Sequence, residues 1–330
     1  MRTVFLTGAS GFIGRHLAQQ LAKGGTRVHV LARTTSQTSH LQHANIRLFQ
    51  GDLLNRDSIR IAMKGCSQVY HLGGLAKMWM KDKAAYHRVN VTGTDNVLTA
   101  AASSGAEKII VTSTAGVLPP SNGTLTNEDS PKQPSLYTEY ERTKNEGEEL
   151  AKAYASQGLP VVIINPTKVY GPGPIDDSNS ATMMARNYML GTWKIIPGNG
   201  KGAMNYVYID DEVNGIITAM EKAQPGSQYI IGGENASYDR FFELVRSIAG
   251  MQRKLVHIPY PLIRTIAWFE DTKTKLFGAR PMITSEWVKK LPYDWSKDIS
   301  KAERELGYRA RSLEEGLNST ISWLRLTNQV

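Results

Sequence analysis

The chain has 330 residues, of which 41% are hydrophobic and 21% charged, and this composition excludes a disordered or fibrous protein. Its length favours one large domain with a smaller companion. The net charge of +9 favours anionic partners, but the basic residues are scattered, with no run longer than Lys289-Lys290. We therefore expect no nucleic-acid partner.

No stretch reaches the roughly 18 consecutive apolar residues of a membrane helix, and the apolar run that starts at Val4 ends at Thr7. We expect neither a signal peptide nor a membrane span, no membrane partner, and a cytoplasmic location. The one cysteine, Cys66, cannot form an intramolecular disulfide and is expected to be a small half-buried residue. No metal site is expected.

Short β-branched runs alternate with segments of helical period in the N-terminal half, as in a doubly wound parallel sheet. The predicted strands are Thr3–Leu6, Arg27–Ala32, Ile46–Gln50, Gln68–His71, Lys108–Thr112 and Val161–Asn165. The predicted helices are Phe12–Lys23, Asp57–Lys64, Tyr86–Ser104 and Leu136–Gln157. The sequence therefore predicts an α/β fold with a Rossmann-type, dinucleotide-binding domain over residues 1–170.

Past about residue 170 the elements become shorter and turn residues more frequent, which predicts a smaller, helix-rich substrate-binding lobe over residues 171–330. The strand candidate Tyr206–Ile209 and the helix Asp210–Lys222 are exceptions, and we expect residues 206–232 to rejoin the main sheet. Ser300 with Glu303, and Ser312 with Glu315, have capping-box spacing, so helices are expected just after both serines.

A glycine-rich turn joins the first strand to the first helix, with Gly8, Gly11 and Gly14 three residues apart. Such glycines allow a tight turn, close approach of backbone amides to a pyrophosphate, and close packing of helix on strand. Position directly after the first strand makes this motif a strong indication of dinucleotide binding. The expected contacts here are Gly8, Ser10, Gly11, Phe12, Ile13 and Gly14.

Further cofactor contacts are expected at the carboxyl ends of the following strands. Arg33 ends the second strand, where its guanidinium suits a 2′-phosphate, so NADP(H) is preferred while NAD(H) remains possible. Asp52 follows the third strand and is either an acceptor for the adenine amino group or a turn or N-cap residue. The remaining predicted contacts are Leu53, Leu72, Gly73, Gly74, Thr112, Tyr140, Lys144, Pro166 and Val169.

Tyr140 and Lys144 are four residues apart on a predicted helix, so both side chains lie on one face. There the ammonium is expected to lower the phenol pKa from about 10 while the phenol exchanges a proton with a substrate oxygen. Thr112, Ser113 and Thr114 end the preceding strand and offer hydroxyls to that oxygen. A second match, Tyr293 with Lys297, has no such context and is interpreted as chance.

Seven motifs follow one another in the order seen in one enzyme superfamily. They are Thr-Gly-x-x-Gly-x-x-Gly (7–14), Gly-Asp-Leu (51–53), Val-Tyr-His-Leu (69–72), Val-Asn-Val-Thr-Gly-Thr (89–94), Thr-Ser-Thr (112–114), Tyr-x-x-x-Lys (140–144) and Asn-Pro-Thr-Lys-Val-Tyr-Gly-Pro (165–172). The chain resembles the extended short-chain dehydrogenase/reductases over essentially its whole length. Within them it is most similar to the dihydroflavonol reductase-like group, which neighbours the 3β-hydroxysteroid dehydrogenases.

The resemblance implies that Tyr140 is the acid/base, Lys144 its activator, and Thr114 the hydroxyl that polarises the carbonyl, with Ser113 as the second candidate. Asn90 resembles the family asparagine that holds the backbone and a water of the catalytic region. The alternative is a helix-interior asparagine bonded to a neighbouring strand.

The sequence at the end of the fourth strand contains two glycines and a histidine, Gly73, Gly74 and His71. The family commonly has two alanines where this chain has Gly73 and Gly74, and the change is expected to enlarge or loosen the pocket near the nicotinamide. His71 is expected to be buried and hydrogen-bonded rather than catalytic.

These observations predict an NADP(H)-dependent oxidoreductase that moves a hydride between nicotinamide and a carbonyl or secondary alcohol. The predicted substrate is uncharged and partly hydrophobic, and its candidate contacts are Trp79, Thr114, Tyr140, Tyr170, Met183 and Met204, although core packing would also explain the apolar ones. The protein itself is expected to be a monomer or a homodimer; family members can pair through the helices predicted at Tyr86–Ser104 and Leu136–Gln157.

Two alternatives remain open. The same fold hosts nucleotide-sugar epimerases and dehydratases, but the dehydratases use a carboxylate pair beside the catalytic threonine, and residues 112–114 offer no acid. Sugar-nucleotide enzymes also tend to carry Arg-Asp where this chain has Met204-Asn205. The second alternative is a non-catalytic NADP-binding sensor or assembly protein, which would not need the Tyr140 and Lys144 pair.

Overall fold

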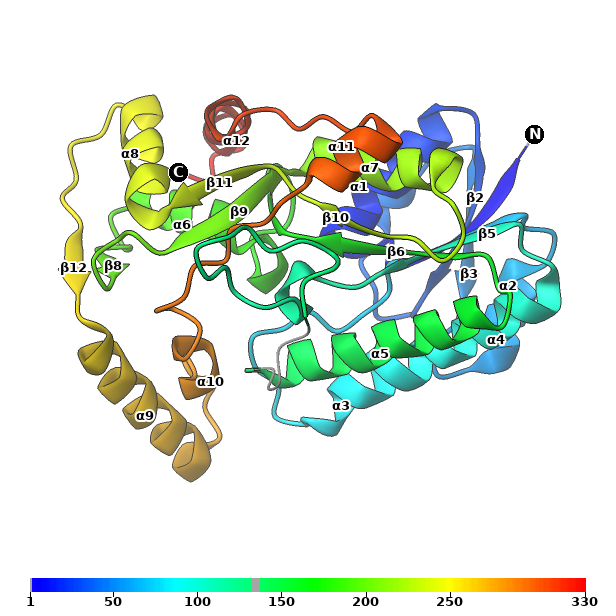
Figure 1. Ribbon diagram of the computed structural model, residues 1–330, viewed down its shortest axis with the longest axis horizontal. Helices are drawn as coiled ribbons and strands as arrows, with labels where there is room; N and C mark the ends of the chain where they lie inside the picture. The colour runs from blue at the N-terminus through cyan, green and yellow to red at the C-terminus, as the bar shows by residue number, and fades with distance from the viewer. Residues whose placement is uncertain (1, 132–136) are drawn as a thin grey trace.

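The computed structural model describes residues 2–131 and 137–330, with a seven-stranded parallel sheet at its centre (Figure 1). Its strands are β1 (Thr3–Thr7), β2 (Arg27–Ala32), β3 (Ile46–Gln50), β4 (Gln68–His71), β5 (Lys108–Thr112), β6 (Val161–Pro166) and β10 (Gln228–Ile231). Their order across the sheet is β10-β6-β5-β4-β1-β2-β3. This is a doubly wound Rossmann sheet with a further strand beside β6, which confirms the predicted fold class.

Helices cover both faces of the sheet (Figure 1). One face carries α2 (Arg56–Met63), α4 (Gly93–Ser104) and α5 (Glu139–Ser156), and the other carries α1 (Phe12–Lys23) and α7 (Ile209–Lys222). Side chains of a strand point alternately to the two faces. Val4 and Leu6 of β1 therefore enter the core shared with α1, whereas Phe5 enters the core shared with α2.

Two further short helices, α3 (Ala84–His87) and α11 (Ser300–Leu306), pack on this first lobe. The second lobe consists of β7 (Lys168–Tyr170), α6 (Ser180–Met189), β8 (Ile195–Pro197), β9 (Ala203–Tyr208), β11 (Glu234–Ser237), α8 (Tyr238–Ala249), β12 (Val256–Ile258), α9 (Tyr260–Phe277), α10 (Ser285–Val288) and α12 (Leu313–Leu326). A three-stranded sheet, β11-β9-β7, and the pair β12-β8 belong to this lobe.

Residues 206–232 divide between the two sheets. The strand expected at Tyr206–Ile209 is β9, which pairs with β7 and β11 and does not join the main sheet. The main sheet instead gains β10, which pairs parallel with β6. Helix α7 packs between the main sheet and the three-stranded sheet. The asparagine at position 205 helps to hold β9 in its own sheet, because its amide donates to Gly233 O at 2.8 Å.

The predicted helices differ from the observed ones mainly at their ends. The segment expected as one helix from Tyr86 to Ser104 starts at Ala84 and contains a π-helical turn at Arg88–Thr92. The first residue of the helix expected from Leu136 lies outside the described residues, and α5 begins at Glu139, capped by Thr138. Ser312 makes the expected capping box. The expectation for Ser300 is wrong, because Ser300 is itself the first helical residue.

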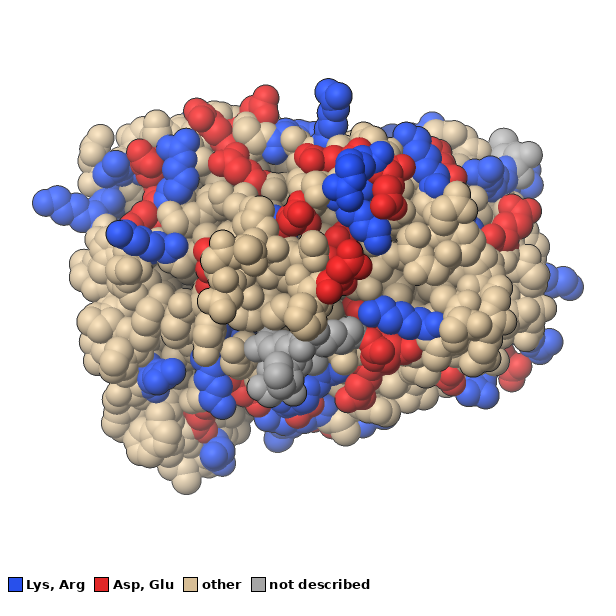
Figure 2. All heavy atoms as spheres, in the orientation of Figure 1, with Lys and Arg blue, Asp and Glu red and all other residues tan. Residues whose placement is uncertain are grey.

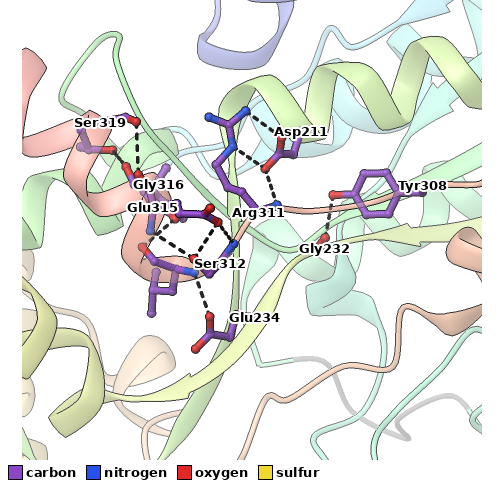
Figure 3. A network of polar contacts seen from close by, with 12 residues as sticks. Asp211, Gly232, Glu234, Tyr308, Arg311, Ser312, Glu315, Gly316 and Ser319 are labelled. Atoms are coloured by element: carbon purple, nitrogen blue, oxygen red, sulfur yellow. Dashed lines mark hydrogen bonds and ion pairs between the residues drawn. The ribbon is translucent and has the colours of Figure 1, made fainter.

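A polar network ties the segment before α12 to the rest of the protein (Figure 3). The Arg311 guanidinium donates two hydrogen bonds of 2.9 Å to the buried Asp211 carboxylate on α7, and the Arg311 backbone amide adds a third. Tyr308 donates to Gly232 O at 2.7 Å, and Glu234 accepts from the Leu313 amide at 2.8 Å. The C-terminal segment is therefore fastened to both β11 and α7.

Among the described residues, no helix combines the length and the apolar character needed to cross a membrane. Cys66 is buried, more deeply than expected, and burial raises the pKa of its thiol to about 12. A thiol held neutral in this way behaves as a small apolar core residue.

We predict that Asp211→Ala lowers the free energy of unfolding by about 2–4 kcal/mol, because it leaves a half-buried guanidinium and an amide without their acceptor. The exposed neighbour Asp210→Ala is the control and should change it by less than about 0.5 kcal/mol. Urea unfolding followed by circular dichroism measures both. Equal effects of the two variants would contradict the importance given to the network.

Candidate active site

The turn between β1 and α1 has the geometry expected of a phosphate-binding loop. Gly8 has φ of 78°, and a Cβ there would lie 2.6 Å from the Leu72 carbonyl carbon. A Cβ on Gly14 would lie 2.2 Å from Gly8 O. Side chains at these two positions would thus close the turn, whereas glycines leave the first amides of α1 open to an anion. The loop fits a dinucleotide pyrophosphate.

The loop is fixed from behind by β4. Thr7 Oγ1 lies 2.8 Å from His71 Nδ1 and accepts from the Gly73 amide at 2.9 Å, while His71 Nε2 lies 3.0 Å from Thr94 Oγ1. Burial, with the nearby Lys144 charge, lowers the pKa of His71 to about 3, so the ring is neutral. His71 thus links three segments through hydrogen bonds, as the sequence predicts.

Arg33 lies exposed at the carboxyl end of β2, and Arg15 and His40 lie near one another beside the start of α1. An open pocket of about 510 Å³ is lined here by Arg15, His16 and Gln37 together with the loop at Pro172. Burial lowers the pKa of both His16 and His40, so the positive charge at this pocket is that of Arg15, which could hold a cofactor phosphate. Asp52 accepts a hydrogen bond from the Leu54 amide at 2.9 Å, so one carboxylate oxygen serves the turn, and the adenine contact stays a prediction.

Tyr140, Thr114 and Lys144 converge at the end of β5. Lys144 Nζ donates to Thr112 O at 2.5 Å, and Thr114 Oγ1 accepts from the Gly116 amide at 3.2 Å. Burial raises the pKa of Tyr140 to about 12, and the nearby Thr114 side chain opposes that rise. Burial, rather than the lysine, therefore dominates the phenol pKa, unlike the sequence expectation. Burial also lowers the pKa of Lys144 to about 8.

Asn90 holds the backbone beside this group. Its Oδ1 accepts from the Leu75 amide at 2.7 Å, and its Nδ2 donates to Thr143 Oγ1 at 3.0 Å. The residue lies in the π-helical turn, which widens the helix at this point. Asn90 therefore joins three segments, the π-helical turn, the loop after β4 and α5.

The glycines at positions 73 and 74 do not enlarge the pocket as expected. A Cβ on Gly73 would lie 2.9 Å from Thr7 Oγ1, and one on Gly74 would lie 3.2 Å from Asn90 Oδ1. Neighbouring side chains already fill most of the space that the alanines would use.

Of the other predicted residues, Thr112 is buried with no hydrogen-bond partner for its hydroxyl among the described residues, and Ser113 is buried next to Glu148.

The sequence analysis missed a buried polar group behind β5. Glu148 Oε2 accepts from Asn165 Nδ2 at 2.9 Å, and the same amide donates to Thr114 O at 3.1 Å. Gln228 Nε2 donates to Asn165 Oδ1 at 2.8 Å. Glu148 is four residues beyond Lys144 on the same face of α5, and this spacing was the available signal.

A second missed feature is a group of lysines, of which Lys290 and Lys297 lie over the Trp295 ring and Lys168 lies near Lys290. Lys290 pairs with the buried Glu141 and lies over the Trp295 ring at 4.4 Å, and Lys297 lies over the same ring at 5.4 Å. Lys168 donates to Ser180 Oγ at 3.1 Å. Burial, with the Lys290 charge, lowers the pKa of Lys168 to about 8. A lysine within the apolar run 161–170 was the signal for this feature.

The four apolar substrate candidates separate in space. Met204 forms a bridge with Trp295 and so lies beside the lysines, and Trp79 lies half-buried in the loop that precedes α3. Tyr170 is fully buried, with its hydroxyl donating to Leu313 O, so it is a core residue. Met183 lines a different pocket, of about 520 Å³, next to Trp323.

The fold and this geometry define a dinucleotide-binding α/β protein with a tyrosine, a threonine and a lysine at the carboxyl edge of its sheet. The chain belongs to the NAD dependent epimerase/dehydratase family, whose model matches residues 4–232. The resemblance to the extended short-chain dehydrogenase/reductases is thereby confirmed, and a nicotinamide dinucleotide is the cofactor of this class.

Individual relatives have different reactions. The chain is 28% identical to a Synechocystis protein named after dihydroflavonol 4-reductase, over 97% of this chain and 94% of the relative. It is 26% identical to a 2-alkyl-3-oxoalkanoate reductase of Shewanella oneidensis, over 95% and 84%. The UDP-glucuronic acid 4-epimerase of Bacillus cereus in complex with NAD superposes with a TM-score of 0.78 at 26% identity, over 98% and 99%.

We predict that Glu148→Gln lowers the pKa of Lys144 below about 8, because the Glu148 carboxylate favours the charged ammonium. The titration is followed by NMR on protein with ¹³C-labelled lysine, with the signal assigned through Lys144→Met. Glu146→Gln, an exposed change on the same helix, is the control and should leave the titration in place. A Lys144 midpoint unmoved by Glu148→Gln would contradict the electrostatic role.

Proposed function

We propose that the protein is an NADP(H)-dependent oxidoreductase that interconverts a carbonyl and a secondary alcohol on a partly hydrophobic substrate. The observation that carries this proposal is the place of the Thr114 hydroxyl beside the Tyr140 phenol, close enough to lower the phenol pKa, with the Lys144 ammonium on the same helix face. These are the groups needed to bind an oxygen and to move one proton to or from it.

In the proposed reduction the Thr114 hydroxyl donates a hydrogen bond to the substrate oxygen and Tyr140 supplies the proton to it. A nicotinamide dinucleotide held at the glycine turn would supply the hydride for this reaction. Lys144, charged below about pH 8, stabilises negative charge that develops near the phenol. Asn90 and the Glu148–Asn165 contact hold the Tyr140 and Thr114 side chains in position. Ser113, directed toward Glu148, is given a supporting role only.

For the cofactor, we propose that Gly8, Gly11 and Gly14 bind the pyrophosphate and that Arg33 binds a 2′-phosphate. The exposed Arg33 guanidinium at the end of β2 favours NADP(H) over NAD(H), and Arg15 at the start of α1 supplies a second positive charge for the cofactor phosphates. NAD(H) remains the competing choice, because the epimerase with the similar structure was solved with NAD.

The lysines near the site revise the expected charge of the substrate. Lys168 is half-buried, and its one hydrogen bond among the described residues is to the Ser180 hydroxyl. Lys290 is paired with Glu141, and burial lowers the pKa of Lys297, which lies near Asp294, to about 7, so Lys168 is the cation here without a carboxylate partner among the described residues. A substrate carboxylate would offset this charge. We therefore favour a hydrophobic oxo or hydroxy acid, the chemistry in the name of the Shewanella relative, over the uncharged ketone.

A nucleotide-sugar epimerase is the second candidate, since such an enzyme has a similar structure. The absence of an acid at residues 112–114 argues against a dehydratase, and the apolar Met204 argues against a diphosphate at that position. The non-catalytic sensor is disfavoured because Thr114 and Tyr140 lie beside one another, with Lys144 on the same helix as Tyr140.

We predict that Tyr140→Phe lowers kcat by at least about 100-fold, because the proton donor is lost, while affinity for NADPH stays within about twofold. Loss of NADPH absorbance measures kcat and fluorescence measures binding. Tyr293→Phe, in the chance motif, is the matched control and should retain activity. Full activity of Tyr140→Phe would remove the basis of the proposal, and full biological function without turnover would favour a sensor.

We predict that Arg33→Ala raises the KM for NADPH about tenfold or more and leaves that for NADH nearly unchanged, because one charge-assisted contact to the 2′-phosphate is lost. Arg27→Ala, at the opposite end of the same strand, is the control. Equal losses with both cofactors would contradict a 2′-phosphate contact.

We predict that Lys168→Met raises the KM for a medium-chain 3-oxo acid about tenfold, because the ion pair with the carboxylate is lost. The KM for the corresponding methyl ester should stay the same in the variant. Lys194→Met, an exposed lysine of the same lobe, is the control. Wild-type protein that prefers the ester would instead support the uncharged substrate of the sequence analysis.

A further inference from the structure

Helix α9 exposes a stripe of large apolar side chains. Leu262, Ile266, Phe269 and Leu276 are 41–72% exposed, and their spacing of four, three and seven residues puts them on one face. Phe277 and Met282, at the end of the helix and just after it, are each 79% exposed. Apolar side chains that gather on one helix face in this way mark an interaction surface more often than isolated exposed ones do.

Trp268 adds an aromatic group beside the stripe. Its ring is 59% exposed and meets the Phe269 ring edge-on, with centroids 4.9 Å apart. The opposite face of α9 is already used, because Ile263 and Ala267 are buried in a small core with Val288 of α10. The stripe is therefore not the packing face of the helix.

Positive charge is concentrated around this stripe. Residues 251–290 contain eight Lys and Arg against three Asp and Glu, and two of these bases, Arg280 and Lys290, pair with Asp177 and Glu141 outside the segment. Two of the acids also accept from backbone amides, Glu270 from Met282 at 2.9 Å and Asp271 from Ser285 at 3.1 Å. Figure 2 shows the end of the molecule formed by α9 as largely uncharged atoms bordered by Lys and Arg.

We propose that α9 docks the protein on an anionic membrane surface, lying in the plane of the headgroups with its apolar stripe inserted. Exposed Phe, Leu and Trp side chains with flanking Lys and Arg are the composition of an interfacial helix. A second copy of this chain fits less well, because an isologous contact would bring two positively charged segments together. The sequence analysis expected no membrane partner because it considered only spanning segments.

Docking would act close to the substrate side of the protein. Beyond α9, Arg280 pairs with Asp177 at 2.7 Å, and Trp287 Nε1 on α10 donates to Met78 O at 3.3 Å. The helix is thus connected to the loop that carries Trp79. A protein held in this way would meet hydrophobic substrates at the lipid surface, yet the docking itself does not depend on the proposed reaction.

The test is co-sedimentation of the full chain with vesicles of phosphatidylcholine alone and of phosphatidylcholine with phosphatidylglycerol. We expect binding to the anionic vesicles, weakening with salt, and at least about tenfold less binding to the neutral ones. The double change Phe269→Ser with Leu276→Ser should reduce anionic-vesicle binding about tenfold or more. Lys273→Gln with Lys275→Gln should reduce it as well.

Ile61→Ser with Leu326→Ser removes two equally exposed apolar side chains elsewhere and is the matched control. Thermal unfolding and NADPH-dependent turnover of all variants report whether they fold. Absence of binding to anionic vesicles overturns the proposal, as does binding that the α9 double change leaves intact. A wild-type dimer that this change converts to a monomer would instead identify the stripe as an interface between copies.

Discussion

The contact between Glu148 on α5 and Asn165 on β6 sets the relation of the helix to the sheet. Both side chains are fully buried, and leaving the Glu148 carboxylate unpaired there would cost several kcal/mol. Only a position of α5 that keeps this hydrogen bond is therefore stable. The same asparagine amide holds the backbone of Thr114. Tyr140 and Lys144 lie about two turns and one turn before Glu148, respectively, and their distance from Thr114 follows from this arrangement.

Much of the fold could be predicted because the sheet is buried on both faces. Four of the six predicted strands have the observed bounds. A strand buried on both faces is a continuous apolar run, so the turn residues on either side mark where it starts and ends. The glycine turn and Tyr140 with Lys144 were predictable because their spacing is local. His71 was predictable as a buried residue because it ends such a strand.

The rest depends on contacts between distant residues. No local pattern separates Tyr170, which packs against α12, from a pocket residue, and β9 has the composition of a main-sheet strand although it pairs with β7 and β11. The effect of Gly73 depends on Thr7, 66 positions earlier. Lys168 could be seen as unusual in the sequence, but its neighbour Lys290 is brought near only by the folded chain.

The attachment of Arg311 to Asp211 has a consequence for where the protein could be divided. The region that matches the family model ends at residue 232, yet Arg311 reaches back into it, and the Tyr170 hydroxyl inside it is covered by the start of α12. A fragment ending at residue 232 would lack the segment that covers Asp211 and Tyr170, and both side chains would become exposed to solvent. The stability of the N-terminal region therefore depends on contacts that the C-terminal segment supplies.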